Sequence, residues 1–245
     1  MIAANGERAQ IAPVSSLQHC SIPTSWYVCR VLPNRPFRPP AVNARDKLLE
    51  AAVRLIRANG FAATSVDQLC AAAGVTKGAF FHHFASKEAL GVAAAEYWSA
   101  STGAFFADAP FHALPDPADR ALAYIDLRIA LIGGPVESFS CVAGTLVQEA
   151  FRSSAAIRIA AEASIMGNAR ALEADLDAAI AQCGVSGTTG ASLARHVQAV
   201  IQGAFVLAKT QPEEDGASLA REQLGHLRRY FAMLFGKTHP EETMP

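Results

Sequence analysis

The chain has 245 residues, of which 51% are apolar and 18% charged, and its net charge at pH 7 is −1. This length can bury a sizeable core. The chain contains no uninterrupted apolar run of 18 residues, so we expect no membrane-spanning helix. The first residues lack the basic start and apolar block of a signal peptide, which favours a cytoplasmic protein. The five cysteines are odd in number and irregularly spaced, which disfavours a disulfide framework.

Charge is distributed unevenly along the chain. Residues 1–40 carry four Arg and one Glu, whereas residues 101–245 carry 11 basic and 16 acidic side chains. A basic end on an acidic body is compatible with nucleic-acid contact at that end.

Residues 1–40 show no helical period, and five prolines between positions 23 and 40 exclude a continuous helix there. We expect a disordered or extended arm. Two roles are compatible with it: Arg30, Arg35 and Arg38 could reach a DNA groove, or the arm could be a solvated tail.

The first predicted helix begins near Ala44, in the run ARDKLLEAAVRLIRANG. One apolar stripe contains Leu48, Ala52, Leu55 and Ile56. Arg54 and Arg57 are expected outside this stripe, and Gly60 is expected to end the helix.

Two short helices follow, and their spacing predicts a helix-turn-helix. Thr64 and Asp67 suggest a capping box for the first, which should end at Gly74. The second should begin at Lys77. Because a Gly-Val-Thr turn joins the two helices, we expect a DNA-binding domain over residues 41–86.

The rest of the chain reads as a helical domain over residues 87–240. Ser86 should cap a helix that runs to about residue 106. Further helices are expected at about 118–132, 136–151, 155–182, 188–209 and 216–235. The sequence therefore predicts an all-α fold of about nine helices.

The run from Ala44 to Leu90, with NGF, TSVDQ, AAAGV, KGAFFHHF and SKEAL in this order, resembles the DNA-binding head of the TetR/AcrR family of bacterial transcriptional regulators. SCVAGTLVQEA (140–150) and HVQAVIQGAFVLAKTQ (196–211) are similar to regulatory domains in part of that family. The resemblance implies a helix-turn-helix head, a C-terminal ligand-binding and dimerisation domain, and a homodimer that binds double-stranded DNA.

In this resemblance the second short helix enters the major groove. Phe80 and Phe84 are expected to hold it on the head. Phe81 stands where the family usually has Tyr, so it should make an apolar contact only. The expected DNA-binding residues are Thr64, Ser65, Thr76, Lys77, Gly78, Ala79, Phe81, His82, His83 and Lys87.

Within this set, Thr76 and Lys77 are expected at base edges. Thr64, Ser65 and Lys87 are expected at phosphates. The adjacent His82 and His83 also suggest a metal site. Neighbouring side chains on a helix point in different directions, however, and no Cys or carboxylate stands at ligand spacing. We predict no metal and no cofactor.

A ligand pocket in the body is expected to have apolar walls and a few polar groups. The candidates are Tyr97, Trp98, Phe105, Phe106, Tyr124, Leu127, Arg128, Phe139, Gln148 and Phe205. Taken singly, most of these residues fit plain core better than a pocket lining. Arg128 could be exposed, or could pair with a ligand carboxylate, Asp126 or Glu149.

The last two helices resemble the family's dimer face, with Leu193, Val197, Val200, Ile201, Ala204, Ala208, Leu224, Leu227 and Phe231 on it. The alternative is that this stripe packs inside one chain. Cys70 and Cys141 raise a redox-sensor hypothesis, which their apolar sequence neighbours disfavour.

The resulting hypothesis is a dimeric repressor that a small molecule releases from a pseudo-palindromic operator. The alternatives are an architectural DNA-binding protein without a ligand and an enzyme with a DNA-binding head. No nucleophile–base set or phosphate loop in the sequence supports an enzyme.

Overall fold

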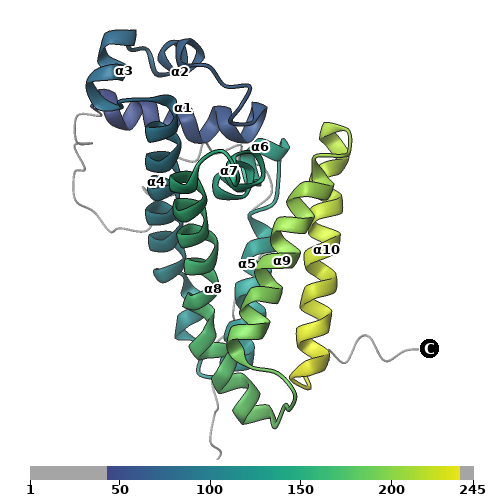
Figure 1. Ribbon diagram of the computed structural model, residues 1–245. Helices are drawn as coiled ribbons and strands as arrows, with labels where there is room; N and C mark the ends of the chain where they lie inside the picture. Colours follow the sequence, from purple (N-terminus) through teal and green to yellow (C-terminus); the bar gives the residue numbers. More distant parts are fainter. Residues whose placement is uncertain (1–42, 238–245) are drawn as a thin grey trace, which may run out of the picture. The chain divides into compact units, whose positions relative to one another are not determined.

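The computed structural model describes residues 43–237, and within them every regular element is helical (Figure 1). The predicted all-α class is confirmed. The elements are α1 (Ala44–Asn59), α2 (Val66–Ala73), α3 (Lys77–His83), α4 (Lys87–Ala107), the 3-10 helix η3 (Pro110–Ala113), α5 (Pro117–Ala130), α6 (Val136–Phe139), α7 (Val142–Ala150), α8 (Ala155–Cys183), α9 (Gly190–Ala208) and α10 (Glu213–Leu234). Residues 1–40, for which an arm was predicted, lie outside the described part.

Helices α1 to α3 form a head at one end of the long helices α4, α8, α9 and α10 (Figure 1). Across residues 43–237, no helix has the length and apolar character needed to cross a membrane.

The cap of α2 differs from the prediction. Ser65, and not Thr64, is the N-cap residue: its Oγ accepts from the Gln68 amide at 3.2 Å, while Gln68 Oε1 accepts from the Ser65 amide at 2.7 Å. Thr64 is buried, and its hydroxyl donates to the Gly60 carbonyl at 2.7 Å. The sequence places several capping side chains together here, and only the tertiary position of Thr64 decides between them.

The single helix predicted over 136–151 is two helices. Ser140 has extended backbone (ψ 167°) and separates α6 from α7. Cys141 then caps α7, with its Sγ accepting from the Gly144 amide at 3.4 Å. Because Cys is an uncommon capping residue, no local pattern indicated this break.

The head does not have a hydrophobic core of its own. The buried cluster around Leu48, Leu69 and Phe80 also contains Leu90 of α4, and it is completed by residues of α7 and α8. Those contributed by α7 and α8 are Val142, Leu146, Ala150, Ile157 and Ala160. The expected boundary at residue 86 therefore does not divide two cores.

The head is also tied to the body by polar contacts. The Ala62 amide donates to Glu149 of α7 at 2.6 Å, and the Ala62 carbonyl accepts from Lys87 Nζ at 3.1 Å. Ser154, the N-cap residue of α8, donates its hydroxyl to Glu88 of α4. These contacts fix the loop before α2 on the body.

The structure corrects the predicted dimer face. Eight of them are at most 3% exposed and belong to the core of one chain: Leu193, Val197, Ile201, Ala204, Ala208, Leu224, Leu227 and Phe231. Val200 is partly buried against the same core. Because α9 packs between α8 and α10, this stripe is covered within the chain and is inaccessible to a second subunit.

Candidate DNA interface and effector region

The turn between α2 and α3 has the geometry that a helix-turn-helix requires. Gly74 adopts the left-handed conformation (φ 63°), and its amide bonds back to carbonyls at the end of α2. Thr76 caps α3, with its Oγ1 accepting from the Ala79 amide at 3.1 Å. Gly74 thus makes the turn between the two helices, and Thr76 caps the N-terminus of α3.

One side of α3 is buried and the other is open. Phe80 is fully buried, and Phe84, which follows the helix, is 4% exposed. The adjacent Phe81 is 53% exposed, a large fraction for an aromatic ring. Thr76, Lys77, Gly78 and His82 are exposed beside it, and Ala79 and His83 are partly exposed. The predicted base-reading residues therefore lie on an accessible helix surface.

Lys77 pairs with Asp67 across the turn, at 2.9 Å between Nζ and Oδ1. Both side chains are more than half exposed (58% and 74%), and exposed pairs of this kind contribute little to stability. The pair thus holds the Lys77 ammonium near the start of α3 and is weak enough for the ammonium to leave Asp67 for another partner.

The three predicted phosphate contacts have different settings. Thr64 is 1% exposed with its hydroxyl already bonded, so its side chain cannot anchor a phosphate, which corrects the prediction. Ser65 is exposed at the N-terminus of α2. Lys87 Nζ bonds the Ala62 carbonyl and lies 4.7 Å from the Phe61 ring centroid, and burial lowers the pKa of its ammonium.

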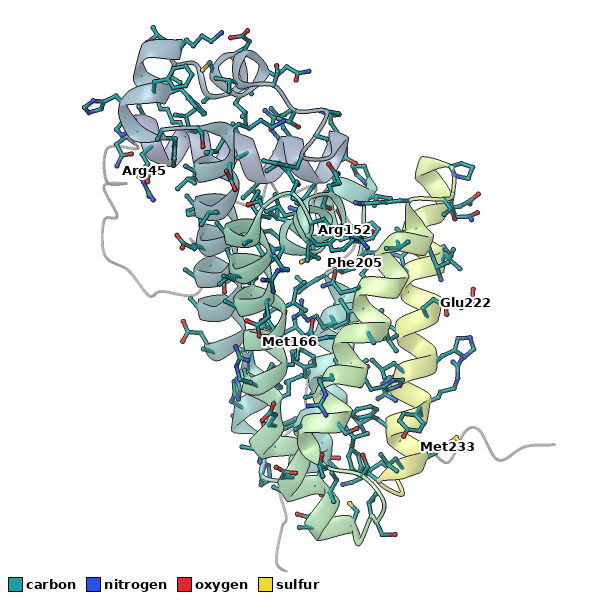
Figure 2. All side chains as sticks on the ribbon, in the orientation of Figure 1. Arg45, Arg152, Met166, Phe205, Glu222 and Met233 are labelled. Carbon is teal, nitrogen blue, oxygen red and sulfur yellow. The ribbon has the colours of Figure 1, made fainter. Side chains whose placement is uncertain are left out.

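The sequence analysis missed a basic residue beside α3. Arg45 is exposed at the N-terminus of α1, and its guanidinium lies 5.7 Å from the ring of Phe84, just after α3 (Figure 2). A cation at the start of a helix works against the helix dipole, which is a sequence signal that could have marked Arg45.

The residues predicted to line a ligand pocket do not share one location. Phe105, Phe106, Tyr124, Leu127, Phe139 and Phe205 belong to the core of the body, where Phe139 and Phe205 have ring centroids 5.8 Å apart. Tyr97 and Trp98 pack instead against the head-side cluster. Gln148 is exposed, with its Nε2 donating to the Gly144 carbonyl. The predicted set of ten is therefore wrong as a single lining.

Arg128 has an aromatic setting. Its guanidinium lies 3.9 Å from the Phe106 ring centroid, and its Nε donates to the Tyr124 hydroxyl at 2.8 Å. The suggested carboxylate partners are engaged elsewhere, because Asp126 pairs with Arg228 and Glu149 accepts from Ala62. Arg128 is thus a partly buried cation held by aromatic groups.

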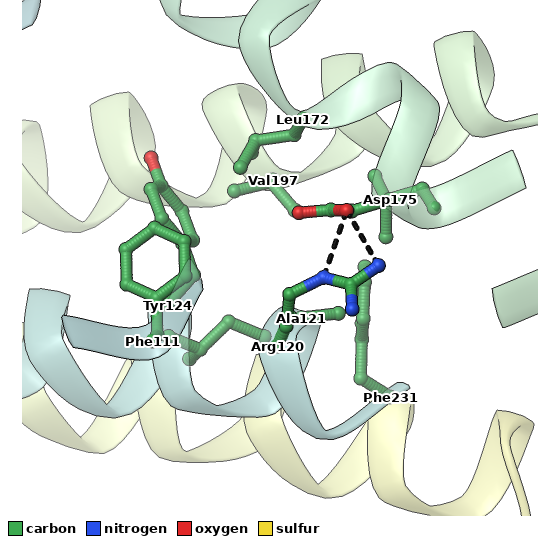
Figure 3. A pocket seen from close by; sticks show the side chains of 10 residues that line it. Phe111, Arg120, Ala121, Tyr124, Leu172, Asp175, Val197 and Phe231 are labelled. Carbon is green, nitrogen blue, oxygen red and sulfur yellow. Dashed lines mark hydrogen bonds and ion pairs between the residues drawn. The ribbon is translucent and has the colours of Figure 1, made fainter. Parts of the chain in front are cut away.

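A small cavity lies beside this cluster, bounded by Phe111, Tyr124, Leu172 and Phe231 (Figure 3). The Arg120–Asp175 ion pair, 2.9 Å long, closes one side of it. Its volume of about 10 Å³ is room for one water molecule at most. This cavity is too small for an effector molecule.

The cysteines have settings that differ from each other. Cys70 is buried, and burial raises the pKa of its thiol. Cys141 is partly exposed, and the charges of Arg57 and Lys209 act on it. Cys141 also packs against the apolar core of the body, as its sequence neighbours indicated.

The His82 and His83 rings lie 4.9 Å apart. Among the side chains that the structure describes, no group of three or more His, Cys, Asp or Glu is arranged to hold a metal ion.

Residues 48–94 match the family model described as "Bacterial regulatory proteins, tetR family". Over 54 residues, the chain is 41% identical to the HTH-type transcriptional regulator YerO of Bacillus subtilis and 43% identical to the HTH-type transcriptional repressor AcnR of Corynebacterium efficiens. Each match covers 22% of this chain, but 19% of YerO and 29% of AcnR. The sequence similarity is thus concentrated in the head.

Solved structures extend the likeness to the body. The reduced form of E. coli NemR superposes with a TM-score of 0.65 at 24% identity, covering 76% of this chain and 95% of that one. A TetR-family regulator from Agrobacterium tumefaciens gives a TM-score of 0.63 at 23% identity, covering 75% of this chain and 96% of that one. At these identities the likeness shows a shared fold. Residues 48–94 therefore resemble the DNA-binding head of the TetR family in sequence, and the chain shares its fold with solved TetR-family regulators.

Proposed function

We propose that this protein is a sequence-specific transcriptional regulator: a homodimeric repressor that leaves its operator when a small molecule binds the body. The observation that carries the proposal is the open surface of α3, whose Thr76 cap, Lys77 and exposed Phe81 adjoin a fully buried Phe80. A short, firmly anchored helix with an accessible N-terminal half fits the major groove. The repressor direction is supported by the similarity of the head to AcnR.

The first test is selection of bound fragments from sheared genomic DNA of the source organism, followed by sequencing. An enriched inverted repeat is the expected result, because a two-fold dimer reads two half-sites. Diffuse recovery that disappears with salt would contradict the proposal and support the architectural alternative.

Lys77→Ala should reduce the discrimination between the selected repeat and a scrambled repeat. We expect a loss of about 1–3 kcal/mol, the usual contribution of one good base contact. Fluorescence anisotropy with both duplexes measures this difference. Arg170→Ala removes a similarly exposed cation from α8, where its guanidinium faces Glu162, and should leave discrimination unchanged. Equal discrimination by Lys77→Ala and the native chain would remove Lys77 from base reading.

For the dimer we propose the outward face of α9 and α10 in place of the buried stripe. His196, Ala199, Gly203 and Val206 are exposed at spacings of three and four, which places them on one side of α9. Tyr230 and Met233 of α10 are 44% and 72% exposed, and the His196 and Tyr230 rings have centroids 5.6 Å apart. Two such helices from each chain form a two-fold, four-helix interface.

Replacing Val206 and Met233 together with arginine should give a folded monomer. Both side chains are exposed in the single chain, so folding should survive, whereas buried like charges oppose association. Sedimentation velocity measures the change. Ile159→Arg, at a position on α8 that is 59% exposed, is the control and should remain dimeric. A double variant that still sediments as a dimer would place the interface elsewhere.

For the effector we propose the body interior around Arg128. Phe106 and Tyr124 hold its guanidinium, and Phe139 and Phe205 form a second aromatic pair in the same core. Two buried polar atoms, Ser164 Oγ on α8 and Gln198 Nε2 on α9, have no hydrogen-bond partner in the described residues. A ligand that binds better when the heads are spread apart would shift the population away from the DNA-binding arrangement.

A further inference from the structure

Arg57 is a buried cation at the junction of head and body. It belongs to the last turn of α1, where the helical stripe predicted it outside the core, but it is 5% exposed. Its guanidinium lies 4.8 Å from the ring centroid of Trp98 on α4. Burial lowers the pKa of Arg57 to about 10, so the side chain is still charged at neutral pH.

The charge lacks a direct partner. Arg57 Nε and Nη2 are both buried without a hydrogen bond, and none of the carboxylates whose side chains the structure describes is within the 4.0 Å of an ion pair. These two nitrogens lie on one edge of the planar guanidinium, and their parallel N–H groups match the two oxygens of a carboxylate. A buried unpaired charge of this kind is costly.

Helices α6 and α7, which Ser140 connects, both pack against α1. Ser140, in the link between α6 and α7, is 1% exposed, and its Oγ also lacks a hydrogen-bond partner. It precedes Cys141 at the N-terminus of α7, and the charge of Arg57 acts on Cys141. This nine-residue helix therefore adds the positive end of its dipole to the surroundings of Arg57.

Lys209, at the end of α9, supplies a second cation. Its Nζ donates to Thr145 Oγ1 in the first half of α7 at 3.1 Å, and the charges of Arg57 and Lys209 act on each other. Lys209 is exposed, whereas Arg57 and Ser140 are buried. The three residues therefore differ in their access to solvent.

The acidic neighbours do not fill this place. Glu137 of α6 acts on Arg57 through space, but it forms no ion pair with it. Glu149 of α7 accepts the hydrogen bond of the Ala62 amide. The described part of the chain therefore offers the free edge of Arg57 no direct anionic contact.

We propose that Arg57, Ser140 and Lys209 form a binding site for the carboxylate group of a small organic acid. This site is distinct from the effector site proposed around Arg128, and it rests on the proposed function for its regulatory meaning. Arg57 moves with α1 of the head, whereas Ser140 and Lys209 belong to the body. An acid bound to all three stabilises one position of the head over others, in proportion to its differential affinity.

The test is a thermal-shift titration of the full chain without DNA, using acetate and benzoate against the uncharged acetamide and benzamide at constant ionic strength. The carboxylates should raise the Tm of the native protein and the amides should not. Arg57→Met removes the charged edge but keeps an apolar stem, so it should lose the shift. Without any acid it should melt no lower than the native protein. Ser140→Ala should reduce the shift.

Arg54→Met is the matched control, since Arg54 is an exposed arginine of the same helix, and it should retain the full shift. Equal shifts from acids and amides, or no shift from the acids, would overturn the proposal. So would a shift that persists in Arg57→Met, or an Arg57→Met protein that melts well below the native one in buffer. Because no DNA is present, these outcomes are separate from a failure to select an operator.

Discussion

Replacing Phe80 with alanine is expected to lower the free energy of unfolding by about 3–5 kcal/mol and to abolish binding to the selected DNA. The ring is 0% exposed and lies in the cluster that joins α1, α3 and α4. Helix α3 has seven residues and is too short to persist without packing. Urea unfolding followed by circular dichroism measures the stability, and fluorescence anisotropy measures the binding.

Phe81→Ala is the matched control, since it removes the same ring from the adjacent position. Phe81 is 53% exposed and contacts Phe80 edge-on, with centroids 5.1 Å apart. Its loss should change stability by no more than about 0.5 kcal/mol, as for most surface positions, and should weaken DNA binding only through the lost apolar contact. Similar losses of stability in both variants would show that Phe81 is part of the core.

The second large effect is expected at Gly190, the first residue of α9. A Cβ added there would lie 2.5 Å from the Glu173 carbonyl oxygen and 2.7 Å from Asp177 Oδ1. The Gly190 amide donates to this Asp177 oxygen, so α8 and α9 meet at this point. Gly190→Ala must push the two helices apart and should cost about 1–3 kcal/mol, as overpacked cores do.

Gly167→Ala on α8 is the control for Gly190→Ala. A Cβ at Gly167 has nothing within 4 Å. There the higher helix propensity of alanine should raise stability by roughly 0.5–1 kcal/mol. Opposite signs in urea unfolding would confirm the close approach at Gly190, and a gain at both positions would exclude it.

Local signals explain why the head was predictable. Gly74 ends α2, Thr76 caps α3 and Ser86 caps α4, and each acts within four residues of its own position. Phe80 and Phe81 show the limit of such signals, since both are phenylalanine and only packing separates the buried ring from the exposed one. A seven-residue helix is too short for hydrophobic periodicity to show which of the two rings is buried.

Long-range packing explains the errors. Arg57 is buried because Trp98 of α4 covers the side of α1 that its own stripe leaves open. On α9, periodicity correctly identifies an apolar stripe with Leu193 and Ile201, but it does not say that α8 and α10 of the same chain cover it. Likewise, the charges of Arg57 and Lys209 interact with each other, although these positions are far apart in the sequence and no local pattern connects them.

The core shared by head and body limits how this protein can be recombined with others. A chimera that joins residues 41–86 to the body of another regulator would leave Leu48 and Phe80 without Leu146 and Ile157, against which their cluster is built. It would also lose the carboxylate of Glu149 that holds the Ala62 amide. A transplant of DNA specificity therefore has to carry the matching surfaces of α4, α7 and α8, or exchange only the exposed residues of α3.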